Sequence, residues 1–160
     1  MAISIDRELY FRVERLHADY IGCIDDDRLE EWPYLFIDAG RYEVMPRENA
    51  DRGLPMPLLL CDNRKMMLDR VLSLRRANIY QRHHYRHMSS GLRITGIEAG
   101  EIHAQANYLV VQTLLDGETR IYQAGRYLDR IVDVDGALKF AERRALYDTS
   151  RVQTLLATPV

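Results

Sequence analysis

The sequence predicts an α+β fold in which helices from the first half of the chain pack on a strongly curved antiparallel sheet from the second half. Two observations lead to this class. In the first 80 residues, apolar side chains recur every three or four positions, which is the helical period. After Arg82 the period becomes two, and glycine-containing turn dipeptides separate four long segments. A long first helix lying across a curved sheet would close the core into a cone.

The first helix is expected from about Ser4 to Ile24. Ser4 is the expected N-cap, and Asp6 and Glu8 suit the positive end of the helix dipole. The apolar stripe consists of Ile5, Leu9, Val13, Leu16, Tyr20 and Ile24.

Two further helices are expected before the sheet. Asp25-Asp26-Asp27 can cap a short second helix, in which Pro33 marks a bend or a new first turn. The apolar side of that helix would be Leu29, Trp32, Leu35 and Phe36. Asp62 is the expected N-cap of a third helix, whose buried stripe would be Met66, Met67, Val71 and Leu74.

Strands fill most of the remaining chain. Gly40–Val44 is predicted to be a short edge strand, followed by a loop over Met45–Pro57. Four longer strands are expected at 83–97, 101–115, 118–134 and 137–149. Asp116-Gly117 and Asp135-Gly136 favour tight type I′ hairpins, and a looser turn is expected at Ala99-Gly100.

Composition bounds the function classes. A chain of 160 residues fits one domain, 1–160, and 47% apolar with 29% charged residues is ordinary for a globular protein. A net charge of −2 with mixed signs argues against nucleic-acid binding. No apolar run is long enough for a membrane span or a secretory signal, so the cytoplasm is the expected location.

The two cysteines limit the redox chemistry that this chain can support. Cys23 and Cys61 are far apart and stand in no C-x-x-C pair, so they cannot hold an iron–sulphur cluster. Both sit among apolar residues, and buried inert thiols are the expected state.

The most conspicuous polar segment is Arg82–His87. On a strand, His83, Tyr85 and His87 would share one face and Arg82, His84 and Arg86 the other. His83 and His87 would then lie about 13 Å apart, too far for two ligands of one metal ion. We favour a surface that contacts a neighbouring chain over a metal site.

His17 offers a catalytic alternative. It lies beside Val13 and Tyr20 on the first helix and can point toward the core. In a cone with an open pocket, His17 could act as a general base together with Tyr20. A core histidine with a satisfied hydrogen bond is the simpler interpretation.

Several unusual strings carry a family resemblance over essentially the whole chain. They are Glu31-Trp32-Pro33 with Phe36, Tyr42 leading to Pro46-Arg47-Glu48-Asn49, Arg52-Gly53-Leu54-Pro55, Met67-x-Asp69-Arg70-Val71, Tyr80-x-Arg82-His83-x-Tyr85-Arg86-His87, Gly125-x-Tyr127-Leu128-Asp129 and Tyr147-Asp148. In order and spacing, this set resembles the small (β) subunits of Rieske-type aromatic-ring-hydroxylating oxygenases, nearest to those that act on terephthalate, salicylate and anthranilate.

The resemblance implies the cone-shaped fold called NTF2-like, SnoaL-like or cystatin-like. It implies a mainly structural subunit in an α3β3 hexamer that hydroxylates aromatic carboxylates. The large subunit of such a hexamer holds the Rieske [2Fe–2S] cluster and the mononuclear Fe(II), and a reductase supplies electrons from NADH. No metal ligand or catalytic residue is then expected in this chain.

Three hypotheses follow for the function. In the first, the chain is an accessory subunit whose contact residues are Arg47, Arg52, Arg82, His83, Tyr85, Arg86 and His87. In the second, it is a free-standing dehydratase or isomerase that uses His17 and Tyr20, which requires an open polar pocket. In the third, it is a module of the same fold that binds a small molecule without catalysis.

Overall fold

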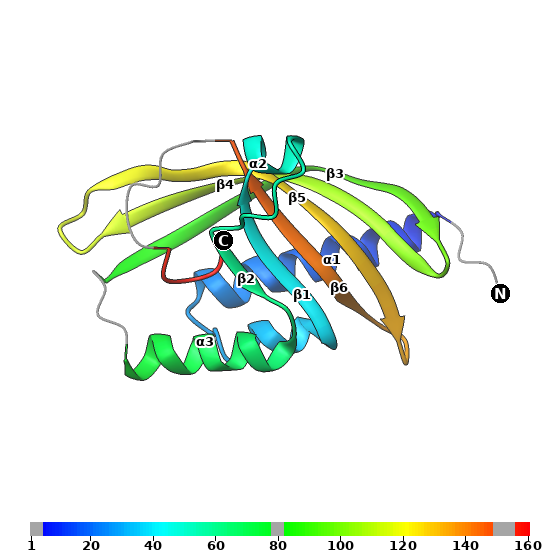
Figure 1. The fold of residues 1–160 in the computed structure, drawn as a ribbon, viewed down its shortest axis with the longest axis horizontal. Coiled ribbons are helices and arrows are strands. Elements are labelled where there is room, and N and C mark those ends of the chain that lie inside the picture. Colours follow the sequence, from blue (N-terminus) through cyan, green and yellow to red (C-terminus); the bar gives the residue numbers. More distant parts are fainter. Residues whose placement is uncertain (1–4, 78–81, 149–155) are drawn as a thin grey trace.

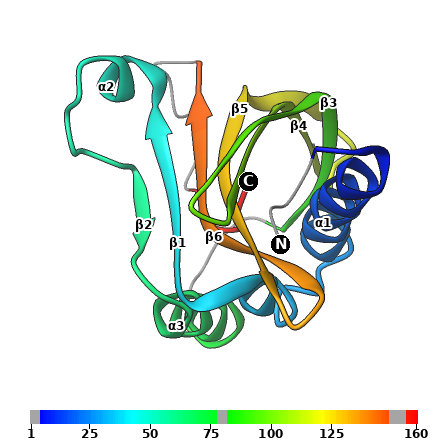
Figure 2. The same cartoon turned by 90° about the vertical axis from the view of Figure 1, so that its right-hand side faces the viewer.

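A computed structural model of the chain describes residues 5–77, 82–148 and 156–160. Over these residues the α+β class is confirmed, because helices lie against one face of a six-stranded sheet (Figure 1). The sheet curls strongly, and helices α1 (Arg7–Asp25) and α3 (Arg64–Arg76) close the concave side (Figure 2). None of the helices in the described part of the chain is both long and apolar enough to span a bilayer.

Helix α1 spans Arg7–Asp25, and its predicted stripe is buried except for Ile5, which is exposed ahead of the helix. The cap is Asp6, whose side chain accepts a hydrogen bond from the Leu9 N–H at 2.8 Å. Ser4, the expected cap, lies outside the described residues.

The expected second helix is one 3-10 turn, η1 (Trp32–Leu35), with Pro33 in its first turn and Phe36 already in the sheet. The expected third helix is α3 (Arg64–Arg76), and its cap is Asn63 rather than Asp62. Met67, Val71 and Leu74 are buried as predicted, whereas Met66 is exposed. The buried face of α3 is therefore narrower than the apolar residues in its sequence suggest.

The six strands form one sheet in the order β2-β1-β6-β5-β4-β3. They are β1 (Phe36–Pro46), β2 (Leu59–Cys61), β3 (His83–Glu98), β4 (Glu101–Leu114), β5 (Thr119–Val134) and β6 (Ala137–Tyr147). The last four match the predicted meander closely. All neighbouring pairs are antiparallel except β1 and β6, which run parallel.

The expected strand at Gly40–Val44 is present, but its predicted short length and edge position are wrong. Strand β1 has 11 residues and lies inside the sheet, because the three residues of β2 pair with its outer edge. The region expected to be a loop contains the end of β1 and a short helix, α2 (Arg47–Asp51). Tyr42–Met45 are all buried, so β1 lacks the alternation that reveals a strand in the sequence.

The turns also differ from expectation in one respect. The Ala99-Gly100 and Asp135-Gly136 turns both have two consecutive residues with positive φ, between 50° and 85°, as type I′ turns require. At Asp116-Gly117 only Gly117 has a positive φ, in a four-residue connection between β4 and β5. The loosest of the three turns is therefore the one at Asp116-Gly117.

Candidate functional site

The cone interior contains a buried polar cluster of His17, Asp129 and Arg143, from α1, β5 and β6. All three side chains are at most 5% exposed. Arg143 donates to both carboxylate oxygens of Asp129, with Nε 2.8 Å from Oδ1 and Nη2 2.7 Å from Oδ2. His17 Nε2 lies 2.8 Å from Asp129 Oδ2, and Arg143 Nη2 lies 3.0 Å from His17 Nε2 and 3.2 Å from Nδ1.

Electrostatics keep this cluster in one protonation state. Burial and the charge of Arg143 lower the pKa of His17, so its ring is neutral near pH 7. A carboxylate only accepts hydrogen bonds, which assigns the proton of the neutral ring to Nε2. Burial alone would raise the pKa of Asp129, but Arg143 and His17 more than reverse this and lower it.

Aromatic rings close around the Arg143 guanidinium. Its central carbon lies 4.2 Å from the ring centroid of Tyr20, 4.0 Å from that of Tyr127 and 4.2 Å from that of Phe140. These distances are typical of cation–π contacts. The space in front of His17 is therefore filled by protein. His17 therefore has the environment of a core histidine. The dehydratase hypothesis requires an open polar pocket around His17, but packed side chains surround it instead.

The segment Arg82–His87 forms the start of β3 with the alternation that the sequence predicts. Tyr85 and His87 are buried, His83 is half-buried, and Arg82, His84 and Arg86 are exposed. The ring of His87 faces inward, where its Nδ1 lies 2.6 Å from Asp25 Oδ1. Its main-chain N–H donates to the second Asp25 oxygen. This pair fixes the strand to the last turn of α1.

A polar hollow of about 410 Å³ opens beside this strand. The ends of α1 and α3 and the first residues of β3 line it, together with Leu115 and Thr158. Arg75 lies in its wall but is already bound to Asp27 and Glu30. Arg82 and His84 line the hollow with exposed side chains, and Asp25 and Asp27 also line it.

The second predicted contact region, Arg47–Pro55, is on the surface at the other end of the sheet. Arg47 pairs with Asp148 at 3.1 Å, and Arg52 pairs with Glu48 at 3.0 Å within α2. Between this region and the outer face of β1 and β6 lies a shallow hollow of about 310 Å³. The sequence prediction placed Arg47 and Arg52 on the surface, and both are exposed.

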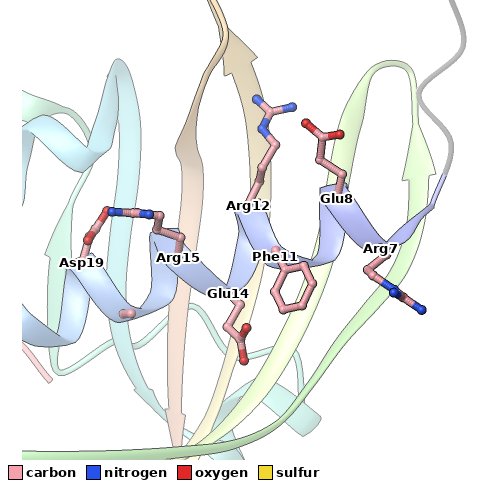
Figure 3. Close-up of a pocket in the computed structure, with 8 residues that line it drawn as sticks. Arg7, Glu8, Phe11, Arg12, Glu14, Arg15 and Asp19 are labelled. Atoms are coloured by element: carbon pink, nitrogen blue, oxygen red, sulfur yellow. The ribbon is translucent and has the colours of Figure 1, made fainter.

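A third depression runs along the outer face of α1. Figure 3 shows Phe11 projecting from this face among charged neighbours that include Arg7, Glu14 and Arg15. Phe11 is 58% exposed. A single aromatic side chain among mixed charges is ordinary protein surface, and this face holds no converging polar groups.

Both cysteines are buried and unpaired, as the sequence predicts. Burial raises the pKa of Cys23 to about 12 and that of Cys61 to about 11, so both remain protonated thiols at neutral pH. Across the described residues, no three His, Cys, Asp or Glu side chains converge as metal ligands would.

Comparison with known proteins identifies the family to which this fold belongs. The family model described as "Ring hydroxylating beta subunit" matches residues 21–154. The anthranilate 1,2-dioxygenase small subunit of Burkholderia cepacia is 51% identical over 99% of this chain and 98% of its own length. A terephthalate 1,2-dioxygenase terminal oxygenase β subunit of Comamonas sp. is 35% identical over 93% of this chain and 97% of its own. The chain belongs to the ring-hydroxylating β-subunit family.

Solved structures give the same result. A protein of Novosphingobium aromaticivorans, described as the β subunit of an aromatic-ring-hydroxylating dioxygenase, superimposes with a TM-score of 0.89 at 44% identity. The match covers 98% of this chain and 100% of the other. The benzoate 1,2-dioxygenase β subunit of Burkholderia mallei has a TM-score of 0.74 at 12% identity, over 92% and 93% of the two chains. A scytalone dehydratase homologue shares the fold at 20% identity. The chain is thus a small subunit of a ring-hydroxylating dioxygenase, and the dehydratase alternative is not supported.

Sequence reasoning found His17 but missed its partners. Asp129 appeared only within a family string, and Arg143 was not singled out. Strand alternation could have placed both on the inner face, since Asp129 and Arg143 are paired across β5 and β6. A buried charge in a predicted strand is the signal that would have indicated the cluster.

Proposed function

We propose that this chain is the mainly structural small subunit of the terminal oxygenase of a dioxygenase that hydroxylates aromatic carboxylates. The observation that carries the proposal is the 51% identity to an anthranilate 1,2-dioxygenase small subunit over nearly the whole of both chains. The terephthalate relative acts on another aromatic carboxylate, which supports the same substrate class.

In this proposal the chemistry belongs to the large subunit. The large subunit would hold the Rieske [2Fe–2S] cluster and the mononuclear Fe(II), and a reductase would bring electrons from NADH. Two features support a non-catalytic role for this chain. The Asp129 carboxylate of its buried polar cluster is paired with Arg143 and His17 inside the chain, while Arg143 Nη1 is buried without a hydrogen-bond partner, and the described residues bring no metal-ligand group together.

We propose an α3β3 hexamer in the cytoplasm, with the large subunits contacting the start of β3 and the α2 region. Arg47, Arg52, Arg82 and Arg86 would supply exposed charges, and the half-buried His83 would lie at the edge of the contact. Tyr85 and His87 point into this chain, so they would act by holding the strand in place. Permanent interfaces of this type usually bury on the order of 2,000 Å² or more.

The test is to co-express this chain with its large subunit and measure the mass of the product by size exclusion with light scattering. We expect a hexamer, and we expect hydroxylation of anthranilate or another aromatic carboxylate but not of an uncharged arene. A large subunit that elutes alone and is fully active would contradict the proposal.

The non-catalytic role needs a separate measurement on the assembled complex. His17→Gln removes the imidazole of the buried cluster with Asp129 and Arg143 while keeping a hydrogen-bonding side chain. Turnover per assembled hexamer should stay within about twofold of the unmodified value, since the reaction occurs in the partner. A loss of turnover in hexamers of normal mass would assign His17 a part in the chemistry.

A further inference from the structure

Residues Leu156–Val160 lie inside the molecule, on the concave side of the sheet (Figure 2). Leu156 is 6% exposed, Ala157 2% and Val160 0%, and all three belong to the hydrophobic core. In Figure 1 this segment, drawn in red, lies between the sheet and α3. A short piece of chain with a bend at Thr158 thus occupies part of the interior that a cone-shaped fold can offer to a ligand.

Two buried tyrosines bind one end of this segment. The hydroxyls of Tyr20 on α1 and Tyr42 on β1 both donate to the Val160 main-chain oxygen, at 2.5 and 3.0 Å. The Val160 N–H donates in turn to the Tyr42 hydroxyl at 3.0 Å. Both tyrosines are 0% exposed, so no water can replace the segment as their partner without entering the core.

Arg70 on α3 binds the other end. Its Nη2 donates to the Leu156 oxygen at 2.6 Å and to the Ala157 oxygen at 2.9 Å. Burial lowers the pKa of Arg70, which reflects the cost of taking its charge out of water. The two carbonyl oxygens offset this cost because a desolvated guanidinium needs acceptors.

We propose that Tyr20, Tyr42 and Arg70 form a peptide-binding site that residues 156–160 fill in cis. The three side chains come from three elements, so the filled site ties α1, β1 and α3 together. Their hydrogen bonds go to main-chain atoms and the surroundings are apolar. The site therefore selects a short apolar peptide that bends at its centre and presents main-chain oxygens at both ends, and an emptied site binds such a peptide in trans.

The first experiment keeps the full chain for folding. A protease recognition sequence is placed within residues 149–155, the folded protein is cleaved, and a fluorescent Leu-Ala-Thr-Pro-Val peptide is added. We expect the cleaved segment to stay bound through desalting and to exchange saturably with the labelled peptide. A peptide with Asp in place of Val should fail to compete, because it would bury an unpaired carboxylate.

Variants of the site distinguish specific from nonspecific peptide binding. Arg70→Met should weaken peptide binding about ten- to a hundredfold, and Tyr42→Phe about two- to tenfold, from the usual strengths of charged and neutral hydrogen bonds. Arg76→Met, at the exposed end of the same helix, is the matched control and should bind as the unmodified protein does.

Cleavage can also unfold the protein, and that outcome is informative. Recovery of cooperative unfolding on addition of the peptide supports the site. Failure of excess peptide to restore the fold overturns the proposal. Loss of the cleaved segment from a protein that remains folded and binds no labelled peptide overturns it as well, as does equal binding by the Arg70→Met and Arg76→Met variants.

Discussion

At the level of single residues, Arg143 is the side chain on which the interior depends most. Its guanidinium is 0% exposed and is bound to Asp129, its only carboxylate partner among the described residues. Removing one member of a buried ion pair leaves the other charge desolvated and unpaired, which costs more than the pair itself contributes. A single substitution that removes one charge of the pair should therefore destabilise the fold, whereas a double substitution that removes both charges should be tolerated.

Asp129→Asn should lower the free energy of unfolding by about 3–5 kcal/mol, since it strands the Arg143 charge. The double variant Asp129→Leu with Arg143→Met should recover most of this loss, because no charge is then left in the core. Denaturant unfolding of the isolated chain measures both. Glu48→Gln, which breaks the exposed pair with Arg52, is the control and should change stability by no more than about 0.5 kcal/mol. A double variant as unstable as the single one would contradict the argument.

His17 should make stability depend on pH on the acidic side of neutrality. Its pKa is lowered in the folded state from an ordinary value of 6.5, chiefly by burial and then by Arg143. From pH 6.5 down to the folded-state pKa, the unfolded chain binds a proton that the folded chain does not. Stability therefore falls with decreasing pH, by at most about 1.4 kcal/mol per pH unit. Unfolding at a series of pH values should show this slope shrink in His17→Gln and persist in His103→Gln, on the outer face of β4. Identical slopes in the unmodified chain and His17→Gln would show that His17 is not buried as a neutral ring.

Residue-level properties were predictable where they depend on local sequence. The helical period placed His17 on the buried face of α1, and strand alternation placed Tyr85 and His87 on one face of β3. The partners of these residues were not predictable, because Asp129 and Arg143 are more than 100 positions from His17. The partner of His87 is Asp25, which the sequence suggested only as a helix cap.

At the level of elements, the contact between β5 and β6 depends on a glycine. A Cβ at Gly125 would lie 2.0 Å from the Leu146 oxygen and 2.8 Å from the Tyr147 Cα, so these backbones approach closely. Gly125→Ala should destabilise the chain by about 1–3 kcal/mol or more, through forced separation of the strands. Gly96→Ala is the matched control in β3, because nothing lies within 4 Å of its added Cβ. Thermal unfolding of the two variants should differ clearly, and equal melting temperatures would refute the close approach.

The start of α3 gives a second test between neighbouring residues. Asn63 Oδ1 accepts from the Met66 N–H at 3.0 Å, while the Asp62 carboxylate lies 3.7 Å from Arg41 Nε. Asn63→Ala should cost about 1 kcal/mol in denaturant unfolding, a typical value for a lost N-cap, and Asp62→Ala clearly less. If Asp62→Ala costs more stability than Asn63→Ala, the N-cap is Asp62, as the sequence predicted.

The elements that the sequence predicted well are those whose pattern is local. The four strands from β3 to β6 alternate and end at glycine turns, so their bounds were predicted within about two residues. β2 and the full length of β1 were missed because their pairing is non-local: Tyr42 pairs with Cys61 on one side and with Arg143 on the other. A strand that is covered on both faces loses its period of two, and three residues are too few to show one.

For the whole molecule, sequence alone predicted the cone and its role better than its surfaces. Exposure of Arg47 or Arg82 follows from polarity, whereas contact with another chain depends on which charges lie together after folding. Two arginine-bearing edges emerge in the fold, one at the start of β3 and one at α2. The outer face of α1 carries arginines too, but Glu8, Glu14 and Asp19 are interspersed among them.

Charge reversal at these edges separates a contact surface from ordinary surface. Arg82→Glu with Arg86→Glu should weaken binding to the large subunit about tenfold or more, because like charges at an interface cost several kcal/mol in unfavourable cases. Arg7→Glu with Arg15→Glu on the outer face of α1 changes the net charge equally and should leave the affinity within about twofold. Both double variants should keep the melting temperature of the isolated chain, since all four side chains are exposed.

Binding is measured by titrating labelled small subunit into large subunit at two salt concentrations. If the α1 variant weakens binding as much as the β3 variant does, the effect is one of net charge, and the proposed contact at the start of β3 is wrong.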